Sequence, residues 1–120
     1  MADAPKKRRK AERRGRFAEG VAVLYLRFKG YRIVATRYKT HAGEIDIIAR
    51  RGDLAVFVEV KARRAAQVAV DAVTPSAMRR IRAASDVWLS RQADAHRLSQ
   101  RYDIVACLPG RLPRHFPDAF

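Results

Sequence analysis

Two short alternating segments joined by a tight turn constrain the fold of this chain more than any other feature of its sequence. The segments read Gly-Glu-Ile-Asp at residues 43–46 and Val-Glu-Val-Lys at residues 58–61. Both are rich in β-branched residues and alternate between apolar and polar positions, which is typical of half-buried β-strands. The Gly52-Asp53 pair between them suits a two-residue hairpin loop. We therefore expect an antiparallel hairpin.

The turn also sets a register for the charged side chains. With Arg51 opposite Leu54, the cross-strand pairs are Ile48 with Phe57, Asp46 with Glu59, and Glu44 with Lys61. Directly opposed side chains have Cβ atoms about 4.5–5.5 Å apart, and like charges opposed in this way destabilise a sheet. Asp46 and Glu59 therefore need a cation nearby, which Lys61 or a hard divalent ion with oxygen ligands can supply.

Two carboxylates and an ammonium on neighbouring strands are the groups that metal-assisted hydrolysis of a phosphodiester requires. The carboxylates bind Mg2+ or Mn2+, the metal polarises the phosphoryl oxygen and lowers the pKa of a bound water, and the lysine orients that water or offsets developing negative charge. The alternative is a surface hairpin that carries a salt-bridged ladder of acids and bases. The spacing by itself leaves both interpretations open.

The charge balance narrows the classes of partner. The 120 residues contain 26 lysines and arginines against 12 aspartates and glutamates, for a net charge of +14 and a pI near 11.2. This excess points to a polyanion, with nucleic acid as the first candidate and an anionic membrane surface as the second. A basic surface that only limits aggregation is the third interpretation.

The sequence predicts a cytoplasmic protein. The basic residues at the start are not followed by the apolar stretch of a secretory signal, and no apolar run approaches the roughly 20 residues of a membrane helix. The single cysteine, Cys107, cannot form an internal disulfide, and its apolar neighbours favour a small buried hydrophobe.

The length predicts a single domain with one hydrophobic core. Residues 1–14 are rich in lysine and arginine, and like-charge repulsion predicts a disordered arm that binds phosphates nonspecifically or keeps the chain soluble. Residues 15–108 carry the periodic patterns of the domain. Residues 109–120 are rich in proline and are expected to form an irregular tail.

Two amphipathic helices are expected in the domain. The first covers about residues 11–29 and ends at Gly30, and its predicted core stripe comprises Phe17, Val21, Leu24, Tyr25 and Phe28. Glu19 lies off this stripe, as an exposed helical glutamate does. The second begins with Thr74 as N-cap and Pro75 in the first turn, and its core stripe comprises Met78, Ile81, Ser85, Trp88 and Leu89.

Five arginines are candidates for contacts with nucleic-acid phosphates, although a solvated basic face is the plainer interpretation. They lie after the hairpin and early in the second helix: Arg63, Arg64, Arg79, Arg80 and Arg82.

The elements follow the order αβββαβ, because further strands are expected at about residues 31–38 and 101–108. The predicted fold class is α/β. A meander of three strands is followed by a right-handed helical crossover, which places the last strand parallel to the third. We expect a mixed four-stranded sheet flanked by a helix on each face.

Several motifs in the same order resemble the YraN family of small bacterial proteins over about residues 15–108. The residues that carry the resemblance are Gly15, Glu19, Ala22, Leu26, Gly30, Tyr31 and residues 43–48, 57–61, 72–75 and 101–105. That family is similar to the Holliday-junction-resolvase group of the restriction-endonuclease-like, PD-(D/E)XK nucleases. The resemblance implies a restriction-endonuclease-like core and metal-dependent cleavage of nucleic acid.

The resemblance also implies roles for the hairpin residues. Asp46 and Glu59 would hold Mg2+ or Mn2+, with the carbonyl of Val60 as a third ligand. Lys61 would be the catalytic lysine.

Two further acids enter through the resemblance. Glu19 matches the first-helix glutamate that completes such sites, and Glu44, paired with Lys61 in the hairpin register, would position that lysine. The chain departs from many relatives at Ala77, where they carry lysine, and at Thr36, where they carry asparagine. Any phosphate contact made by those two groups is missing here.

Three functions are compatible with these expectations. The first is a Mg2+- or Mn2+-dependent endonuclease for branched DNA, which would act as a homodimer because two strands must be cut symmetrically. The second is a non-catalytic nucleic-acid-binding protein with a vestigial metal site. The third is a basic interaction protein, for example one associated with ribosomes.

Overall fold

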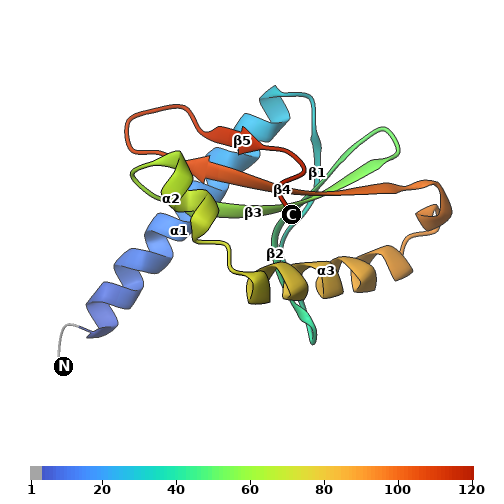
Figure 1. Cartoon of the computed structure of the whole chain (residues 1–120), viewed down its shortest axis with the longest axis horizontal. Helices are drawn as coiled ribbons and strands as arrows, with labels where there is room; N and C mark the ends of the chain where they lie inside the picture. The colour runs from blue at the N-terminus through green and yellow to red at the C-terminus, as the bar shows by residue number, and fades with distance from the viewer. Residues whose placement is uncertain (1–3) are drawn as a thin grey trace.

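The helices and strands follow the predicted order, with additional short elements in the second half of the chain. The computed structural model describes the backbone of residues 4–120 and the side chains of residues 13 and 15–120 (Figure 1). Its elements are α1 (Ala4–Phe28), β1 (Arg32–Thr40), β2 (Gly43–Arg51), β3 (Leu54–Ala62), α2 (Ala66–Asp71), α3 (Pro75–Ser90), the 3-10 helix η1 (Ala95–Arg97), β4 (Ser99–Cys107) and β5 (Arg114–Phe116).

The strands form one mixed sheet in the order β1-β2-β3-β4-β5. β1, β2 and β3 are antiparallel neighbours, β4 is parallel to β3, and β5 is antiparallel to β4. The chain passes from β3 to β4 through α2 and α3, because parallel neighbours need a long crossover connection. The α/β class, the αβββαβ order of the core and the mixed sheet are confirmed.

Both ends of the chain differ from the sequence expectations. The tail is not wholly irregular, since it contributes β5 and the sheet has five strands rather than four. β5 depends on backbone pairing with β4, which no local pattern reveals. At the other end, the backbone of residues 4–14 belongs to α1 where a disordered arm is predicted. Alanine, lysine, arginine and glutamate are good helix formers.

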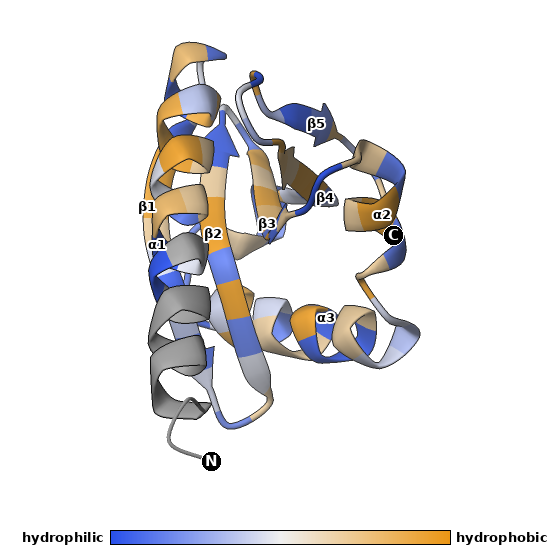
Figure 2. Cartoon of the chain, turned by 90° about the vertical axis from the view of Figure 1, so that its left-hand side faces the viewer, coloured by the Kyte–Doolittle hydropathy of each residue, from blue (hydrophilic) through white to orange (hydrophobic). Residues whose placement is uncertain are grey.

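One long helix covers each face of the sheet (Figure 2). The core on the α1 side comprises Ala18, Ala22, Leu26, Tyr31, Ile47, Ala49, Val56, Val58, Val60 and Val105. The core on the α3 side comprises Ile45, Ile48, Ala55, Phe57, Ile81, Ala84, Trp88, Leu89 and Tyr102. The sheet is therefore buried on both faces, as expected. Within the described part of the chain, no helix is long and apolar enough to cross a membrane.

The helix termini follow the predicted capping chemistry. Gly30 has a φ of +93°, and the Tyr31 N–H donates to the Leu26 carbonyl at 3.0 Å, which closes α1 as a Schellman motif does. At the start of α3, the Thr74 side chain accepts a hydrogen bond from the Ala77 N–H at 3.1 Å. Both helix boundaries are thus determined locally.

α1 packs through a different face from the one predicted. Ala18, Ala22 and Leu26 recur every four residues and are buried against the sheet. The predicted core stripe points outward: Phe17, Leu24 and Phe28 are 75%, 67% and 92% exposed, and Val21 and Tyr25 are half-buried. The prediction is wrong because the two alanines let α1 approach the sheet closely, which large side chains at those positions would prevent.

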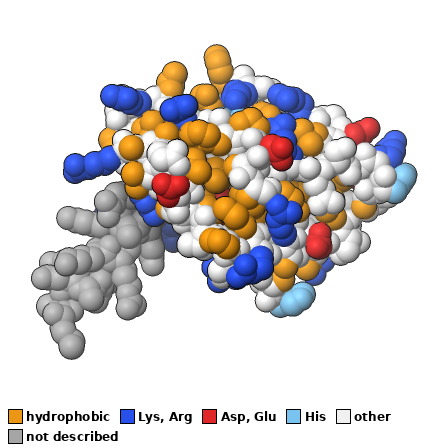
Figure 3. Space-filling view, viewed as in Figure 1, with side chains coloured by type: hydrophobic (Ala, Val, Ile, Leu, Met, Phe, Trp, Pro, Cys, Tyr) orange, Lys and Arg blue, Asp and Glu red, His pale blue; other side chains and the backbone are white. Residues whose placement is uncertain are grey.

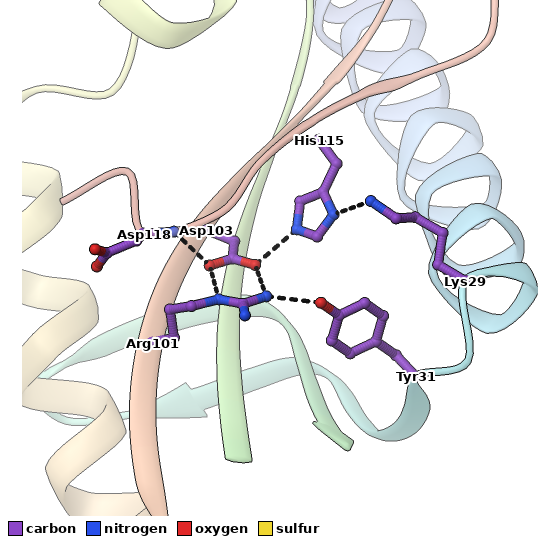
Figure 4. Close-up of polar contacts among 6 residues, drawn as sticks. All are labelled: Lys29, Tyr31, Arg101, Asp103, His115 and Asp118. Carbon is purple, nitrogen blue, oxygen red and sulfur yellow. Dashed lines mark hydrogen bonds and ion pairs between the residues drawn. The ribbon is translucent and has the colours of Figure 1, made fainter.

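A buried polar network joins β4 to the C-terminal segment (Figure 4). The carboxylate of Asp103 is fully buried and accepts hydrogen bonds from Arg101 Nε and Nη2 at 2.9 and 2.8 Å. It also accepts from His115 Nε2 at 2.6 Å and from the Asp118 N–H at 3.0 Å. Burial alone raises the pKa of Asp103, but the hydrogen bonds from His115, Arg101 and Asp118 outweigh it and hold the pKa below its ordinary value.

The same network reaches the junction between α1 and β1. Arg101 Nη2 donates to the Tyr31 hydroxyl at 2.7 Å, and Lys29 Nζ donates to His115 Nδ1 at 2.7 Å. Because an ammonium can only donate, His115 accepts at Nδ1 and carries at Nε2 the proton that it gives to Asp103. One carboxylate therefore connects β4, β5 and the end of α1.

Candidate active site

The hairpin of β2 and β3 opens into a fork at the predicted site. The paired part keeps the predicted register, from Arg51 with Leu54 through Ile48 with Phe57 to Ile47 with Val58. Beyond this point the strands do not pair. Asp46 and Glu59 are therefore not ladder partners, and neither are Glu44 and Lys61, so the predicted register is wrong beyond Ile47 and Val58.

An irregularity in β2 causes the fork. Ile45 lies in the core on the α3 side, whereas Ile47 lies in the core on the α1 side. In a regular strand these two residues would share a face, so the alternation is interrupted at Asp46. The Asp46 side chain fills the opening, and its Oδ2 accepts a hydrogen bond from the Val60 N–H at 2.8 Å. The Asp46 carboxylate thus takes the place of the strand carbonyl that would otherwise accept a hydrogen bond from the Val60 N–H.

The fork opens into a cavity of about 430 Å³ that lies between α1 and α3. Its polar lining consists of Glu19, Glu44, Asp46, Glu59, Lys61 and Arg80, and Ala77 and Ile81 complete the wall. Glu19 comes from α1, the next four from β2 and β3, and the rest from α3. The structure therefore brings together all five acidic and lysine residues proposed from the sequence, although not through the predicted strand pairs.

Glu59 is the acid of this cavity whose pKa is most affected by its surroundings. Its burial, its hydrogen bond with Asp46 and the negative charge of Asp46 raise the pKa of Glu59 to about 9. Lys61 opposes this rise, but its Nζ lies 3.9 Å from Glu59 Oε1, which is too long for a hydrogen bond. At neutral pH the carboxyl group of Glu59 is therefore protonated when no metal ion is bound.

Glu19 is paired with an arginine that the sequence analysis missed. Arg37 Nε on β1 lies 2.8 Å from Glu19 Oε2, and the charges of Glu44 and Asp46 also favour the guanidinium. Arg37 has a φ of +50°, a backbone conformation that is uncommon for a residue with a side chain. This conformation is not readable from the sequence, because the alternating pattern of residues 31–38 predicts an ordinary strand.

The glycine that precedes Glu44 has a steric role beside the cavity. A Cβ added to Gly43 would lie 2.8 Å from the Arg80 carbonyl oxygen and 3.1 Å from Arg80 Cβ. Only a residue without a side chain lets β2 begin this close to α3. Gly43 thus helps to place Arg80 at the cavity.

The five arginines expected to contact phosphates separate in the structure. Among the described residues, Arg80 is the one of this set that lines the carboxylate cavity. Arg79 and Arg82 are exposed on α3, and Arg82 lies over the ring of Tyr102 at 4.9 Å. Arg63 and Arg64 line a different groove, on the other side of α1.

The donor groups of the cavity suit a hard divalent ion, with two ligands from the protein. Carboxylate oxygens are the ligands that Mg2+ and Mn2+ prefer, and an ion beside Asp46 and Glu59 would relieve the repulsion that now retains a proton. Among the described residues, however, no group of three or more acidic, histidine or cysteine side chains is arranged to hold a metal. Val60 meets Asp46 through its N–H, whereas the resemblance implies a role for its carbonyl. Water or substrate oxygens would have to complete the coordination.

These features define a class of protein: an α/β fold with a mixed sheet and a carboxylate-lined cavity at a strand fork between two helices. The chain belongs to the uncharacterised protein family UPF0102, whose family model matches residues 18–107. The resemblance to YraN proteins is thereby confirmed. The matched residues include the whole carboxylate cavity and end with β4.

Two bacterial proteins are similar to this chain over nearly its whole length. A UPF0102 protein of Rhizobium leguminosarum bv. trifolii is 71% identical over 113 residues, which cover 94% of this chain and 93% of the relative. A UPF0102 protein of Agrobacterium fabrum is 63% identical over 114 residues, which cover 95% of this chain and 93% of the relative. The names of these relatives state the family and no activity.

Proposed function

We propose that this chain is a divalent-metal-dependent nuclease that hydrolyses phosphodiester bonds in nucleic acid, with branched DNA as the first substrate to test. The observation that carries this proposal is the convergence of Asp46, Glu59 and Lys61 on one cavity, where burial and the neighbouring Asp46 raise the pKa of Glu59 to about 9. A buried acid perturbed by a neighbouring acid within a cavity is typical of functional sites.

Each residue of the cavity has a distinct role in this proposal. A bound Mg2+ or Mn2+ would polarise a phosphoryl oxygen and lower the pKa of a water molecule. Asp46, held by the Val60 N–H, and Glu59, once it has lost its proton, would hold the ion. Lys61 lies beside Glu59 on the cavity wall, where its ammonium can offset the negative charge that develops on the phosphate. Arg80 faces the same space from α3 and can bind a non-bridging phosphate oxygen.

The charge of the molecule supports a polyanionic substrate. Lysine and arginine side chains are spread over the face seen in Figure 3, where aspartates and glutamates are few. The net charge of +14 favours nucleic acid and accelerates its association with the protein. A cytoplasmic location, and a homodimer that cuts two strands symmetrically, belong to the same proposal.

A second function is favoured by the state of Glu19. This carboxylate is neutralised by Arg37 at 2.8 Å, and the described residues present no cluster of three metal-binding groups. A nucleic-acid-binding protein with a vestigial metal site would have this arrangement. The two functions differ in whether the protein cleaves nucleic acid at this cavity or only binds it.

Cleavage assays on end-labelled linear, single-stranded and four-way-junction DNA, and on RNA, test the proposal in the presence of Mg2+ or Mn2+. We expect the wild-type chain to cut at least one substrate. Glu59→Gln and Asp46→Asn should lower the rate on the order of 100-fold or more, because each removes a metal-binding charge. Asp86→Asn, at an exposed position on α3 outside the cavity lining, is the matched control and should keep full activity.

Two results would contradict the nuclease. Activity that survives Glu59→Gln would show that another site or a contaminant cuts the substrate. Binding of all four substrates without cleavage, under both metals, would support the vestigial site instead.

A further inference from the structure

A second, larger groove lies on the other side of α1 from the carboxylate cavity. It has a volume of about 930 Å³ and runs between α1, the end of β3 and the loop that joins β4 to β5. Phe17, Ala18 and Val21 line it from α1, and the loop residues 108–113 form the opposite wall. None of its described lining residues belongs to the carboxylate cavity.

The walls of this groove carry large apolar side chains that the fold leaves in solvent. Phe17 is 75% exposed on one wall and Leu112 is 79% exposed on the other. In Figure 2 several turns of α1 are coloured as hydrophobic, although only one face of this helix packs on the sheet. Apolar side chains that face each other across a groove are typical of a surface that a partner covers.

The described residues at the rim of the groove carry a single sign of charge. Arg13, Arg63, Arg64 and Arg111 line it, and its described residues include no aspartate or glutamate. The guanidinium of Arg63 is held at the groove by a hydrogen bond from Nη1 to the Ala62 carbonyl at 2.7 Å. Four arginines around an apolar floor match a ligand that combines carboxylates with apolar side chains, because arginine binds carboxylates in a bidentate manner.

We propose that this groove binds an acidic amphipathic peptide segment of a partner protein. Apolar side chains of the segment would lie between Phe17 and Leu112, and its carboxylates would meet the arginines of the rim. The proposal is independent of the nuclease, because it uses none of the residues of the carboxylate cavity.

The chemistry of the groove favours a peptide over two other occupants. Single-stranded nucleic acid needs aromatic platforms for its bases, and Phe17 is the single aromatic residue among the described lining residues, beside leucines, valine and prolines. A second copy of this chain would bring another net charge of +14 against the four arginines. Charge complementarity therefore points to an acidic partner.

A displayed library of random 16-residue peptides, selected on the immobilised full chain, tests this proposal. Excess soluble Phe17→Ser/Leu112→Ser double variant is added as competitor, so that peptides bound elsewhere on the basic surface are removed. Both positions are exposed, so the double variant should fold normally. We expect the selected peptides to combine aspartate or glutamate with leucine or phenylalanine.

Fluorescence anisotropy with the labelled selected peptides then locates the binding. The double variant and Arg111→Glu should each weaken binding at least tenfold. Phe28→Ser is the matched control, because Phe28 is 92% exposed on the same helix but outside the groove, and it should bind as the wild type does.

Three results would overturn the proposal. The first is that every selected peptide binds the wild type and the double variant equally well, or that the peptides that prefer the wild type contain no acidic residues. The second is that a 16-nucleotide single strand binds more tightly than any selected peptide and depends on the same side chains, which would assign the groove to nucleic acid. The third is a dimer in sedimentation equilibrium that the double variant abolishes, which would assign it to a second copy.

Discussion

Glu59 shows how one side chain takes its chemistry from its neighbours. In the unfolded chain its pKa is the ordinary value near 4.5, and in the folded chain it is raised to about 9 by burial and by Asp46. The sequence correctly indicates that Asp46 and Glu59 come together, although they meet across the cavity and not as the ladder partners that the hairpin register predicts. It does not show that Glu59 retains a proton, because that depends on how much water the fold removes.

Metal binding at this site should release a proton. At pH 7 the ion must displace the proton that Glu59 holds, so we expect release of about one proton per Mn2+ bound. Isothermal titration calorimetry in buffers of different ionisation enthalpy measures this number. Glu59→Gln should bind the ion more weakly and release no proton, and an equal release from this variant would show that another group is displaced.

The same residue predicts the pH dependence of stability in the absence of metal. Between about pH 4.5 and 9 the folded chain binds more protons at Glu59 than the unfolded chain does. The contribution of Glu59 to the free energy of unfolding should therefore fall as the pH rises through this window. Urea denaturation of the wild type and of Glu59→Gln at pH 5, 7 and 9 measures it, and equal pH slopes in the two proteins would contradict the assignment.

At the scale of elements, two close approaches decide how the helices lie on the sheet. Ala18 and Ala22 let α1 pack tightly on one face, and Gly43 lets β2 begin against α3 on the other. Small residues contribute little to a hydrophobic pattern, so the pattern of α1 is dominated by its large side chains. The core stripe predicted from Phe17, Leu24 and Phe28 is therefore wrong. A residue contributes to a closely packed core through its shape as well as through its hydrophobicity.

Gly43→Ala should destabilise the chain by about 1–3 kcal/mol, because the new methyl group would meet the backbone of Arg80 rather than a flexible side chain. Gly20→Ala is the matched control. Gly20 lies within α1, and a Cβ added there would have no atom of another element within 4 Å. This change should therefore stabilise the chain by about 0.5–1 kcal/mol. Chemical denaturation measures both effects, and equal effects of the two substitutions would show that the contact with α3 is not tight.

At the scale of the whole molecule, the network around Asp103 holds together segments that are distant in sequence. Arg101 reaches Tyr31 across 70 positions, and His115 joins β5 to the same carboxylate (Figure 4). This network is a long-range constraint on the α1 end of the molecule and on the C-terminal tail. It accounts for the ordered β5 where the sequence predicts an irregular segment.

Asp103→Asn should lower the free energy of unfolding by about 3 kcal/mol, because it removes the fully buried carboxylate and leaves the half-buried Arg101 without its counter-charge. Asp94→Asn, which breaks the more exposed ion pair with Arg50, should cost less, because solvent screens that pair. Denaturation at pH 7 compares the two.

The pH dependence of this effect has a defined sign. The pKa of Asp103 is lowered by folding, so its contribution to stability is present above the unfolded pKa and is lost as the pH falls through the folded pKa. The difference between wild type and Asp103→Asn should therefore shrink in acid. A difference that stays constant down to pH 2 would show that the carboxylate charge is not what stabilises the network.

The elements that can be predicted from the sequence are those whose causes are local. The period-2 pattern and the Gly52-Asp53 turn predict the hairpin and its register up to Ile47 and Val58, and Thr74 and Gly30 mark a helix start and a helix end. These features depend on neighbours along the chain, so the order of residue types is enough to predict them.

Features that depend on residues distant in sequence are visible only in the folded molecule. The fork at Asp46, the pairing of Glu19 with Arg37 and the outward stripe of α1 all arise from contacts between elements. The same residues that suggested a charged ladder therefore form a cavity instead. A carboxylate can replace a strand carbonyl only where the fold holds it against the free N–H, and no local pattern records that contact.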